Sequence, residues 1–245
     1  MFRDLLDGSL DLLLGASCVG CGRPGRLLCR GCAALLPRDA RPCWPVPPPP
    51  GLVTPWAAGE YAGATRAMVV GHKEHRLLAL RAPLAGQLSH AVAAALRELP
   101  PGPTVLVPVP SRPASVRGRG HDPTASITAG AGRLLRARGH DVLTTPMLRT
   151  RPGVVDQAGL GAAERAANLA GSMHCPPEAL RRLAVRRRRA RLVVCDDVLT
   201  TGATAREAQR ALEAVGLQVV AIAAVAATRR RIPPDRAGVS QSADS

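Results

Sequence analysis

Residues 193–204 read Val193-Val194-Cys195-Asp196-Asp197-Val198-Leu199-Thr200-Thr201-Gly202-Ala203-Thr204. An apolar strand here leads into two adjacent carboxylates, and a turn of hydroxyl residues with one glycine then precedes a helix. The backbone N–H groups at that helix N-terminus, together with the glycine and hydroxyls of the turn, predict a cradle for a phosphate. The carboxylates can accept hydrogen bonds from vicinal sugar hydroxyls or hold a hydrated divalent cation. A phosphate beside a diol is the chemistry of a ribose 5-phosphate.

A purely structural interpretation makes Thr200 or Thr201 a helix cap and the aspartates the end of a strand. Two adjacent acids at the C-terminal end of a buried parallel strand argue against it, because ligands of open α/β sheets bind at that edge. A nucleoside-triphosphate P-loop is excluded. The turn lacks the Gly-x-x-x-x-Gly-Lys pattern, and Lys73, the chain's one lysine, lies far upstream.

Strands and helices alternate on either side of this segment. Apolar spacing predicts helices over 82–99, 123–138, 162–169 and 205–215. It predicts strands over 104–109, 142–148, 191–196 and 218–227. This alternation predicts an α/β fold with an open, mainly parallel sheet covered by helices on both faces.

Four of the seven cysteines form two Cys-x-x-Cys knuckles: Cys18, Cys21, Cys29 and Cys32. Two such knuckles can close tetrahedrally on Zn²⁺ through four thiolates, which leaves no open position for a substrate and predicts a structural site. Folding of so small a segment would then depend on the metal. A redox dithiol pair and an iron–sulfur site are the alternatives, but the doubled knuckle favours zinc.

The spacing of the cysteines and the length of the apolar runs predict the cellular compartment of the protein. Paired cysteine spacing of this kind suits a reducing compartment. The longest clean apolar run, Val219 to Ala227, is the length of a strand and too short for a membrane helix. The N-terminus carries aspartates and lacks the basic start of a secretory signal. We therefore expect a cytoplasmic protein without membrane insertion.

The Asp-Asp-x-x-Thr-Thr-Gly-x-Thr loop resembles the fingerprint of the type I phosphoribosyltransferases. Upstream motifs resemble the ComF branch of that fold: Val107-Pro108-Val109-Pro110, then Arg117 and Arg119-Gly120-His121-Asp122, then Gln157, Leu160, Arg165 and Asn168. ComF proteins are linked to DNA uptake in natural transformation and begin with a four-cysteine zinc module. The resemblance covers roughly residues 15–230 and implies a type I phosphoribosyltransferase fold.

The resemblance implies a site for phosphoribosyl pyrophosphate (PRPP) or another ribose-phosphate end. Asp196 and Asp197 would hold the ribose hydroxyls. The 5-phosphate would lie on the loop formed by Thr200, Thr201, Gly202, Ala203 and Thr204.

The same resemblance implies a pyrophosphate loop at the turn Val109-Pro110-Ser111, with Mg²⁺ bridging pyrophosphate and ribose oxygens. Arg117 and Arg119 would neutralise the leaving group, so that Arg119 joins the two aspartates as a catalytic residue. Lys73 stands where ComF proteins usually have a lysine. A solvated surface cation is the alternative interpretation of Lys73.

The acceptor end of the site is less well marked. Purine phosphoribosyltransferases often have a carboxylate where this chain has Thr200, and that carboxylate handles the base proton. Aromatic residues make up only 2% of the chain, and the sequence offers no obvious stacking partner for a nucleobase. The acceptor is therefore left open, as is catalysis itself.

Three regions follow from these patterns. Residues 1–50 comprise an amphipathic helix over 1–16, the zinc module and a proline-rich linker, which we expect to be an extended spacer. Residues 51–231 form the phosphoribosyltransferase-like domain. Residues 232–245 form a polar tail that we expect to be disordered.

The formal charge of +15 is concentrated in arginine runs over 181–191 and 229–231. The longer run either binds DNA phosphates or forms a solvated loop. A second hypothesis for the whole protein is therefore a non-catalytic, zinc-containing protein that binds single-stranded DNA or a competence helicase or translocase. A nucleotide-salvage phosphoribosyltransferase is a third, weakened by the missing carboxylate at Thr200.

Overall fold

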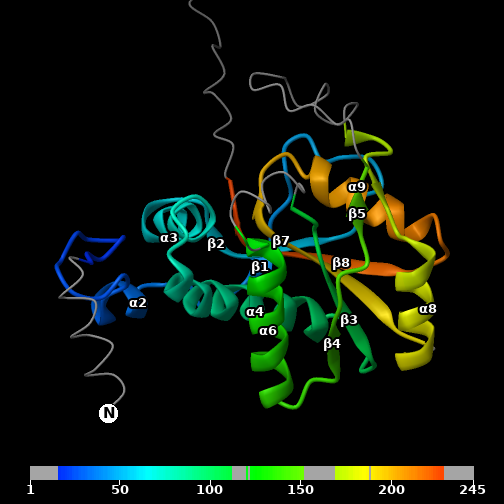
Figure 1. Ribbon diagram of the computed structural model, residues 1–245, viewed down its shortest axis with the longest axis horizontal. Coiled ribbons are helices and arrows are strands. Elements are labelled where there is room, and N and C mark those ends of the chain that lie inside the picture. Colours follow the sequence, from blue (N-terminus) through cyan, green and yellow to red (C-terminus); the bar gives the residue numbers. More distant parts are fainter. Residues whose placement is uncertain (1–15, 112–119, 121, 152–168, 188, 229–245) are drawn as a thin grey trace, which may run out of the picture.

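A six-stranded sheet forms the centre of the computed structural model (Figure 1), which describes residues 16–111, 120, 122–151, 169–187 and 189–228. Its order is β1-β2-β8-β7-β3-β4. The strands are β1 (Arg41–Pro42), β2 (Pro55–Glu60), β3 (Thr104–Pro108), β4 (Val142–Thr144), β7 (Arg191–Leu199) and β8 (Val219–Ala227). Only β1 runs antiparallel to its neighbour, and the other pairings are parallel. The predicted open, mainly parallel α/β sheet is confirmed.

Helices cover both faces of this sheet (Figure 1). One face carries α3 (Gly63–Lys73), α4 (Arg81–Arg97) and α6 (Pro123–Ala137), and a 3₁₀ turn at Leu78–Leu80 precedes α4. The other face carries α8 (Pro177–Arg186) and α9 (Ala203–Glu213). Beside α9 lies a small antiparallel pair, β5 (Arg149–Thr150) and β6 (Met173–His174).

The central strand β7 shows why these residues form a sheet buried on both sides. Leu192 and Val194 pack in the core beneath α9, whereas Val193 and Cys195 pack in the core beneath α3, α4 and α6. Successive strand side chains point to opposite faces, so a continuous apolar run can fill both cores at once.

The elements match the sequence prediction in most places. The predicted helices over 82–99, 123–138 and 205–215 correspond to α4, α6 and α9. The predicted strand over 142–148 is wrong in length, because β4 ends at Thr144 just before Pro146, which has no N–H for a sheet. The predicted helix over 162–169 falls almost wholly outside the described residues, as do the helix over 1–16 and the tail.

Several elements were not predicted from the sequence, among them β2, α3 and α8. The strand β2 is rich in alanine and glycine and begins with Pro55, so it lacks the usual β-branched pattern. The helix α3 contains two glycines, and α8 buries only Ala179 and Leu183. Tertiary packing rather than local propensity stabilises such elements.

The proline-rich segment was expected to be an extended spacer, but it bends at 46–47, turns at 50–51 and packs against the domain. The Arg206 guanidinium donates to the Pro50 carbonyl (2.9 Å), and the Gln209 amide donates to the Gly51 carbonyl (2.9 Å). In return the Val53 amide donates to Gln209 Oε1 (3.1 Å), and Leu52 is buried in the core beneath α9. The segment is therefore a fixed part of the structure next to α9.

The short helix α2 (Arg30–Ala34) belongs to the cysteine module, which lies against the sheet edge. Val19, Leu27, Leu28 and Leu36 pack against the core beneath α3 and α4. In the part of the chain that the structure describes, no helix combines the length and apolar character needed to cross a membrane.

Candidate functional site

The acid pair lies where two neighbouring strands differ in length. Strand β3 pairs with β7 only as far as Pro108 opposite Cys195, and the Val109 amide then donates to the Cys195 carbonyl (2.8 Å). Strand β7 continues to Leu199 along β8. Asp196 and Asp197 therefore belong to β7, which extends the predicted strand of 191–196 by three residues. Because β3 has ended there, their side chains border open space.

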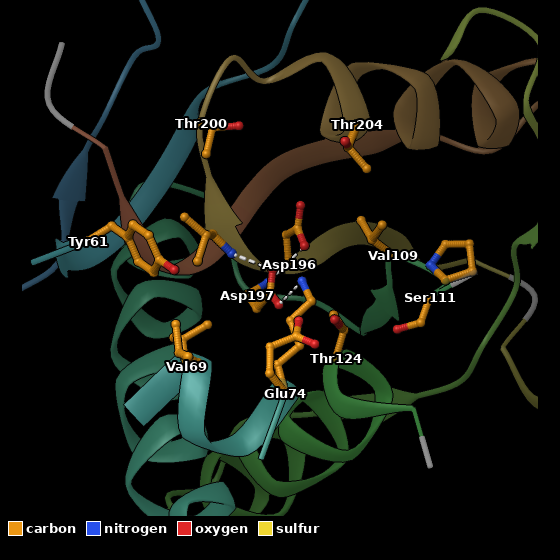
Figure 2. Close-up of a pocket in the computed structure, with 14 residues that line it drawn as sticks. Tyr61, Val69, Glu74, Val109, Ser111, Thr124, Asp196, Asp197, Thr200 and Thr204 are labelled. Atoms are coloured by element: carbon orange, nitrogen blue, oxygen red, sulfur yellow. Dashed lines mark hydrogen bonds and ion pairs between the residues drawn. The ribbon is translucent and has the colours of Figure 1, made fainter. Parts of the chain in front are cut away.

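The two carboxylates face different sides of the sheet. Strand alternation places Asp196 on the side of α9 and Asp197 on the side of α3. Figure 2 agrees, because it shows Asp197 near Glu74 of the α3 side and Asp196 towards Thr204. Lys73, the last residue of α3, binds Asp197 Oδ2 at 2.7 Å. This contact decides against the interpretation of Lys73 as a purely solvated cation.

Asp196 and Asp197 are two acids held close together, with Lys73 as the cation beside them. Both aspartates are buried. Burial, and after it the neighbouring Asp197 charge, raise the pKa of Asp196. Burial lowers the pKa of Lys73, but the charge of Asp197 outweighs this and raises it above its ordinary value. Additional cationic or hydroxyl partners would therefore stabilise the doubly ionised pair.

The turn after β7 is fixed by packing from a distant part of the chain. Gly202 precedes α9 with φ of 74°, a left-handed conformation that side chains disfavour. A Cβ on Gly202 would lie 3.0 Å from Pro45 and 3.2 Å from Pro49. Glycine is therefore required both by the backbone conformation and by the close approach of the proline-rich segment.

A third loop completes the site at the start of α6. Asp122 caps this helix by accepting from the Ala125 amide (3.1 Å), and Pro123 occupies its first turn. The same carboxylate accepts from the Ser111 hydroxyl (2.9 Å) and the Ser111 amide (3.3 Å). Ser111 is thereby held beside the helix N-terminus.

These loops enclose a cavity of about 550 Å³ (Figure 2). In this view Tyr61 lies at one end and Ser111 at the other, with the acid pair between them. Eight residues named from the sequence line it: Lys73, Val109, Pro110, Ser111, Asp196, Asp197, Thr200 and Thr204. Thr201, Gly202 and Ala203 are not among the lining residues and form the turn behind them. Arg117 and Arg119 lie outside the described residues.

Six further residues line the cavity that sequence reasoning did not assign to the site: Tyr61, Val69, Val70, Glu74, Thr124 and Val198. Thr124 follows the Asp-Pro helix start, a signal readable from the sequence. Tyr61, the chain's one tyrosine, and Val69 and Val70 of α3 were not found because β2 and α3 were not predicted.

The four knuckle cysteines converge as their spacing predicts. Their sulfur atoms all lie within 4.8 Å of one another. The Cys29 amide donates to Cys18 Sγ (3.3 Å), and the Cys32 amide donates to Cys29 Sγ (3.4 Å). Burial opposes ionisation of Cys18, but N–H donors led by Cys29 lower its pKa to about 6. Four convergent thiols with amide donors fit a tetrahedral Zn²⁺ site.

The family comparison agrees with this geometry. The model of the phosphoribosyl transferase domain matches residues 160–244. The chain contains a phosphoribosyl transferase domain. The match includes the acid pair, the threonine turn and α9, whereas Lys73, Ser111 and the cysteine module lie upstream of it. A search of curated proteins gives no significant match.

Proposed function

We propose that the chain is a phosphoribosyltransferase that binds PRPP in the 550 Å³ cavity. The observation that supports this most strongly is the cavity's composition: an acid pair in its middle, a threonine turn at a helix N-terminus on one side and the Ser111 loop at the far end. A ribose diol, a 5-phosphate and a pyrophosphate need these three kinds of partner.

In this proposal each group has a stated task. Asp196 and Asp197 accept hydrogen bonds from the ribose hydroxyls, and Lys73 holds Asp197 in place. The turn from Thr200 to Thr204 binds the 5-phosphate, and Pro110 and Ser111 belong to the pyrophosphate loop. Arg119 is proposed to neutralise the leaving group from the loop between Ser111 and Asp122.

The reaction exchanges one bond at C1 of the ribose. The bond from C1 to the pyrophosphate oxygen breaks, and its electron pair leaves with pyrophosphate. A lone pair on the acceptor nitrogen forms the new C1–N bond, and the proton on that nitrogen passes to the released pyrophosphate or to water. Orientation in the cavity and stabilisation of charge supply most of the rate.

Two metals belong to the proposal. The carboxylate oxygens beside the pyrophosphate loop suit Mg²⁺, which would offset the charge of the departing pyrophosphate. Zn²⁺ would be held by Cys18, Cys21, Cys29 and Cys32 in a structural role.

The finer family placement is also a proposal. A four-cysteine module beside a phosphoribosyl transferase domain, and a lysine on the acid pair, support membership of the ComF branch. Membership would link the protein to DNA uptake in the cytoplasm. We propose the division into a cysteine module and linker over 1–50, a catalytic domain over 51–231 and a tail over 232–245.

Calorimetry of zinc-loaded protein with PRPP and Mg²⁺ tests the main proposal. We expect micromolar binding, equivalent to about −8 kcal/mol, that is lost in the Asp196→Asn, Asp197→Asn double variant. The isosteric substitutions keep the hydrogen-bonding shape and remove the charge. A folded wild-type protein that does not bind PRPP would overturn the proposal.

A specific observation favours a second candidate function, the binding of single-stranded DNA. Within the run of 181–191, Arg187 pairs with Asp141 and Arg191 contacts Thr104. Arg181, Arg182, Arg186 and Arg189 remain exposed on and just after α8. Such a surface suits phosphates of a nucleic acid or a partner such as a translocase.

The two functions can be separated. DNA affinity that falls with salt and survives the double aspartate variant supports a binding protein. Release of pyrophosphate that the same variant abolishes supports an enzyme. Turnover with a free nucleobase would support nucleotide salvage in particular.

A further inference from the structure

A groove lies between the cysteine module and the domain. Its volume is about 690 Å³. Cys32 and Leu35 of the module line one wall, and Ala58 of β2 and Ala64 in the first turn of α3 line the other. Figure 1 shows α2 of the module beside α3 at this edge of the molecule. Among the described residues, none lines both this groove and the ribose-phosphate cavity.

The groove has a largely apolar lining and a strongly exposed leucine. The apolar residues on its walls include Leu35, Leu36, Pro37, Ala40, Ala58 and Ala64. Leu35 is 84% exposed, although it stands beside other apolar groups with which it could be covered together. An apolar patch of this kind on a protein surface marks an interaction site.

The apolar surface continues into a second cavity, of about 290 Å³, which meets the ribose-phosphate cavity at Thr200. Arg41 and Glu60 line both the groove and this second cavity. Trp44 and Val46 are exposed on its walls. With the exposed leucine of the groove, they are three of the six large apolar side chains that the described residues leave exposed. Exposed apolar groups are therefore concentrated around the edge strand β1.

Close packing fixes the floor of the groove. A Cβ on Gly59 would lie 2.7 Å from Cγ of Pro37, and a Cβ on Gly20 would lie 2.9 Å from Sγ of Cys32. Backbone and side chains from the two walls therefore touch where these glycines stand. The groove is formed before anything binds in it, which lowers the cost of binding.

The chain itself contains a segment that suits such a groove. At 100° per residue, the sequence of residues 1–15 places Asp4, Asp7 and Asp11 together on one face of a helix. The opposite face carries only apolar side chains, among them Phe2, Leu5, Leu6, Leu10 and Leu13. A helix of about 15 residues is marginal by itself in water, so this one needs an apolar surface to pack on.

The point where this segment joins the described chain lies next to the groove. The Gly25 amide donates to the Ala16 carbonyl (2.8 Å), which fixes the first described residue to the module. Two residues further on, Sγ of Cys18 lies within 4.8 Å of Sγ of Cys32, which lines the groove. A helix of residues 1–15 spans roughly 22 Å from this point. So short a connection gives an effective concentration on the order of millimolar, so even a weak contact would be formed.

The charges of the segment and of the module are opposite. Residues 1–15 contain three aspartates and one arginine. Residues 16–41 contain one acid, Asp39, and five arginines: Arg23, Arg26, Arg30, Arg38 and Arg41. Zn²⁺ bound to four thiolates would offset only part of this positive charge. Helices that lie on membranes usually carry lysine and arginine on the polar face, so a face of aspartates argues against a lipid surface as the partner.

We propose that residues 1–15 dock as an amphipathic helix in the 690 Å³ groove of the same chain. The leucine face covers Leu35 and the wall formed by β2 and α3, and the aspartates lie towards the arginines of the module. The inference goes beyond the proposed function and does not depend on it. It makes the segment a third connection between the cysteine module and the domain, besides the module's packing on the core and the chain that leads into β2.

Photochemical cross-linking of the full, zinc-loaded chain tests this docking. The photoreactive residue p-benzoylphenylalanine replaces Leu35, and in a control protein it replaces Val185. Val185 is 88% exposed on α8, which covers the other face of the sheet. Mixing isotopically light and heavy protein before irradiation distinguishes cross-links within one chain from those between two chains. We expect cross-links from position 35 to residues 1–15 of the same chain, at least tenfold more abundant than those from position 185.

Two triple variants with the same replacement residue separate the two faces of the segment. Leu6→Ser, Leu10→Ser and Leu13→Ser remove the apolar face. Asp4→Ser, Asp7→Ser and Asp11→Ser are the matched control on the opposite face. The leucine variant should lower the cross-link from position 35 at least tenfold, and the aspartate variant less than threefold. Hydrogen exchange should show faster exchange at residues 35–41 and 58–65 in the leucine variant, with unchanged protection in β7.

The remaining outcomes overturn the inference. Cross-links mainly between light and heavy chains would show that the groove holds the segment of a second copy. The absence of a cross-link between position 35 and residues 1–15, or equal yields from positions 35 and 185, would show that the segment does not dock there. Equal losses in the two triple variants would show that the leucine face is not the docking face. None of these outcomes bears on PRPP binding, which calorimetry tests separately.

Discussion

The two cavities that meet at Thr200 are built in opposite ways. The ribose-phosphate cavity depends on one continuous segment, in which the acid pair and the threonine turn lie within nine residues, Asp196 to Thr204. The second cavity, of about 290 Å³, is assembled from four parts of the chain around Trp44, Glu60, Leu199 and Ala227. A contiguous motif can be recognised from the sequence, whereas an assembled wall becomes visible only after folding.

The difference also concerns what holds each cavity in place. Strand pairing and the core beneath α9 fix the acid pair. The wall with Trp44 depends on the segment between the cysteine module and β2, which Gln209 and Arg206 fasten to α9. Perturbations of that segment should therefore affect the second cavity more than the first.

Removal of zinc should have the largest effect, and it should affect the second cavity more than the first. Binding of structural zinc contributes about 10–16 kcal/mol to the folding of small modules, so a chelator should unfold the segment around Cys18 to Cys32. Hydrogen exchange should show loss of protection there, while β7 and β8 stay protected. Trp44 emission, read in a Trp56→Phe variant, should change, and PRPP affinity should fall less than threefold. A tenfold or greater loss of PRPP affinity would show that the module supports the whole site.

Gly202→Ala should damage both cavities, because Gly202 lies between the threonine turn and the proline-rich segment. Its φ of 74° and the 3.0 Å approach to Pro45 predict a loss of about 2 kcal/mol in the free energy of unfolding. Denaturant titration measures this, and calorimetry should show weaker PRPP binding. Gly216→Ala has a similar φ and nothing within 4 Å of the added Cβ, so it controls for backbone strain alone. An equal effect of Gly216→Ala on PRPP binding would contradict the assignment.

Gln209→Leu should affect the second cavity more selectively. The buried Gln209 amide group bonds the Gly51 carbonyl and the Val53 amide, and its loss leaves both groups without that partner. A loss of about 1–3 kcal/mol in the free energy of unfolding is expected. Trp44 emission, read in a Trp56→Phe background, should change while PRPP binding stays near wild type. Loss of PRPP binding with unchanged Trp44 emission would contradict this assignment.

Asp196→Asn should change the free energy of unfolding least of these variants. It should stabilise the protein, whereas the other changes destabilise it. Burial and Asp197 raise the pKa of Asp196 above its unfolded value, so the folded state disfavours its ionised form. The favourable contribution of the Asp196 carboxyl to the free energy of unfolding is fully present below the pKa that this group has in the unfolded state. It is lost as the pH rises through the pKa that the group has in the folded state. At pH 7 the variant should therefore be more stable than wild type by on the order of 1 kcal/mol, with the gain shrinking towards pH 4. A destabilised variant at pH 7 would mean that Asp196 serves folding rather than ligand binding.

The sequence by itself predicted the acid pair, the threonine turn and the convergence of the four knuckle cysteines. Adjacent acids, a glycine with hydroxyls and paired cysteine knuckles have meaning at short spacing, because a strand end, a helix start or a metal brings such residues together locally. The apolar periodicity of residues 82–99 and 123–138 likewise predicted α4 and α6, since each buries a continuous face.

Only the tertiary structure decided which distant residues complete the site. The early end of β3 beside β7 opens the cavity at Asp196, and the last turn of α3 brings Lys73 to Asp197 across 124 residues. Packing of Pro45 against Gly202 places Trp44 beside Thr200. None of these contacts has a local signature, because each arises from the long-range packing of segments whose own propensities are weak.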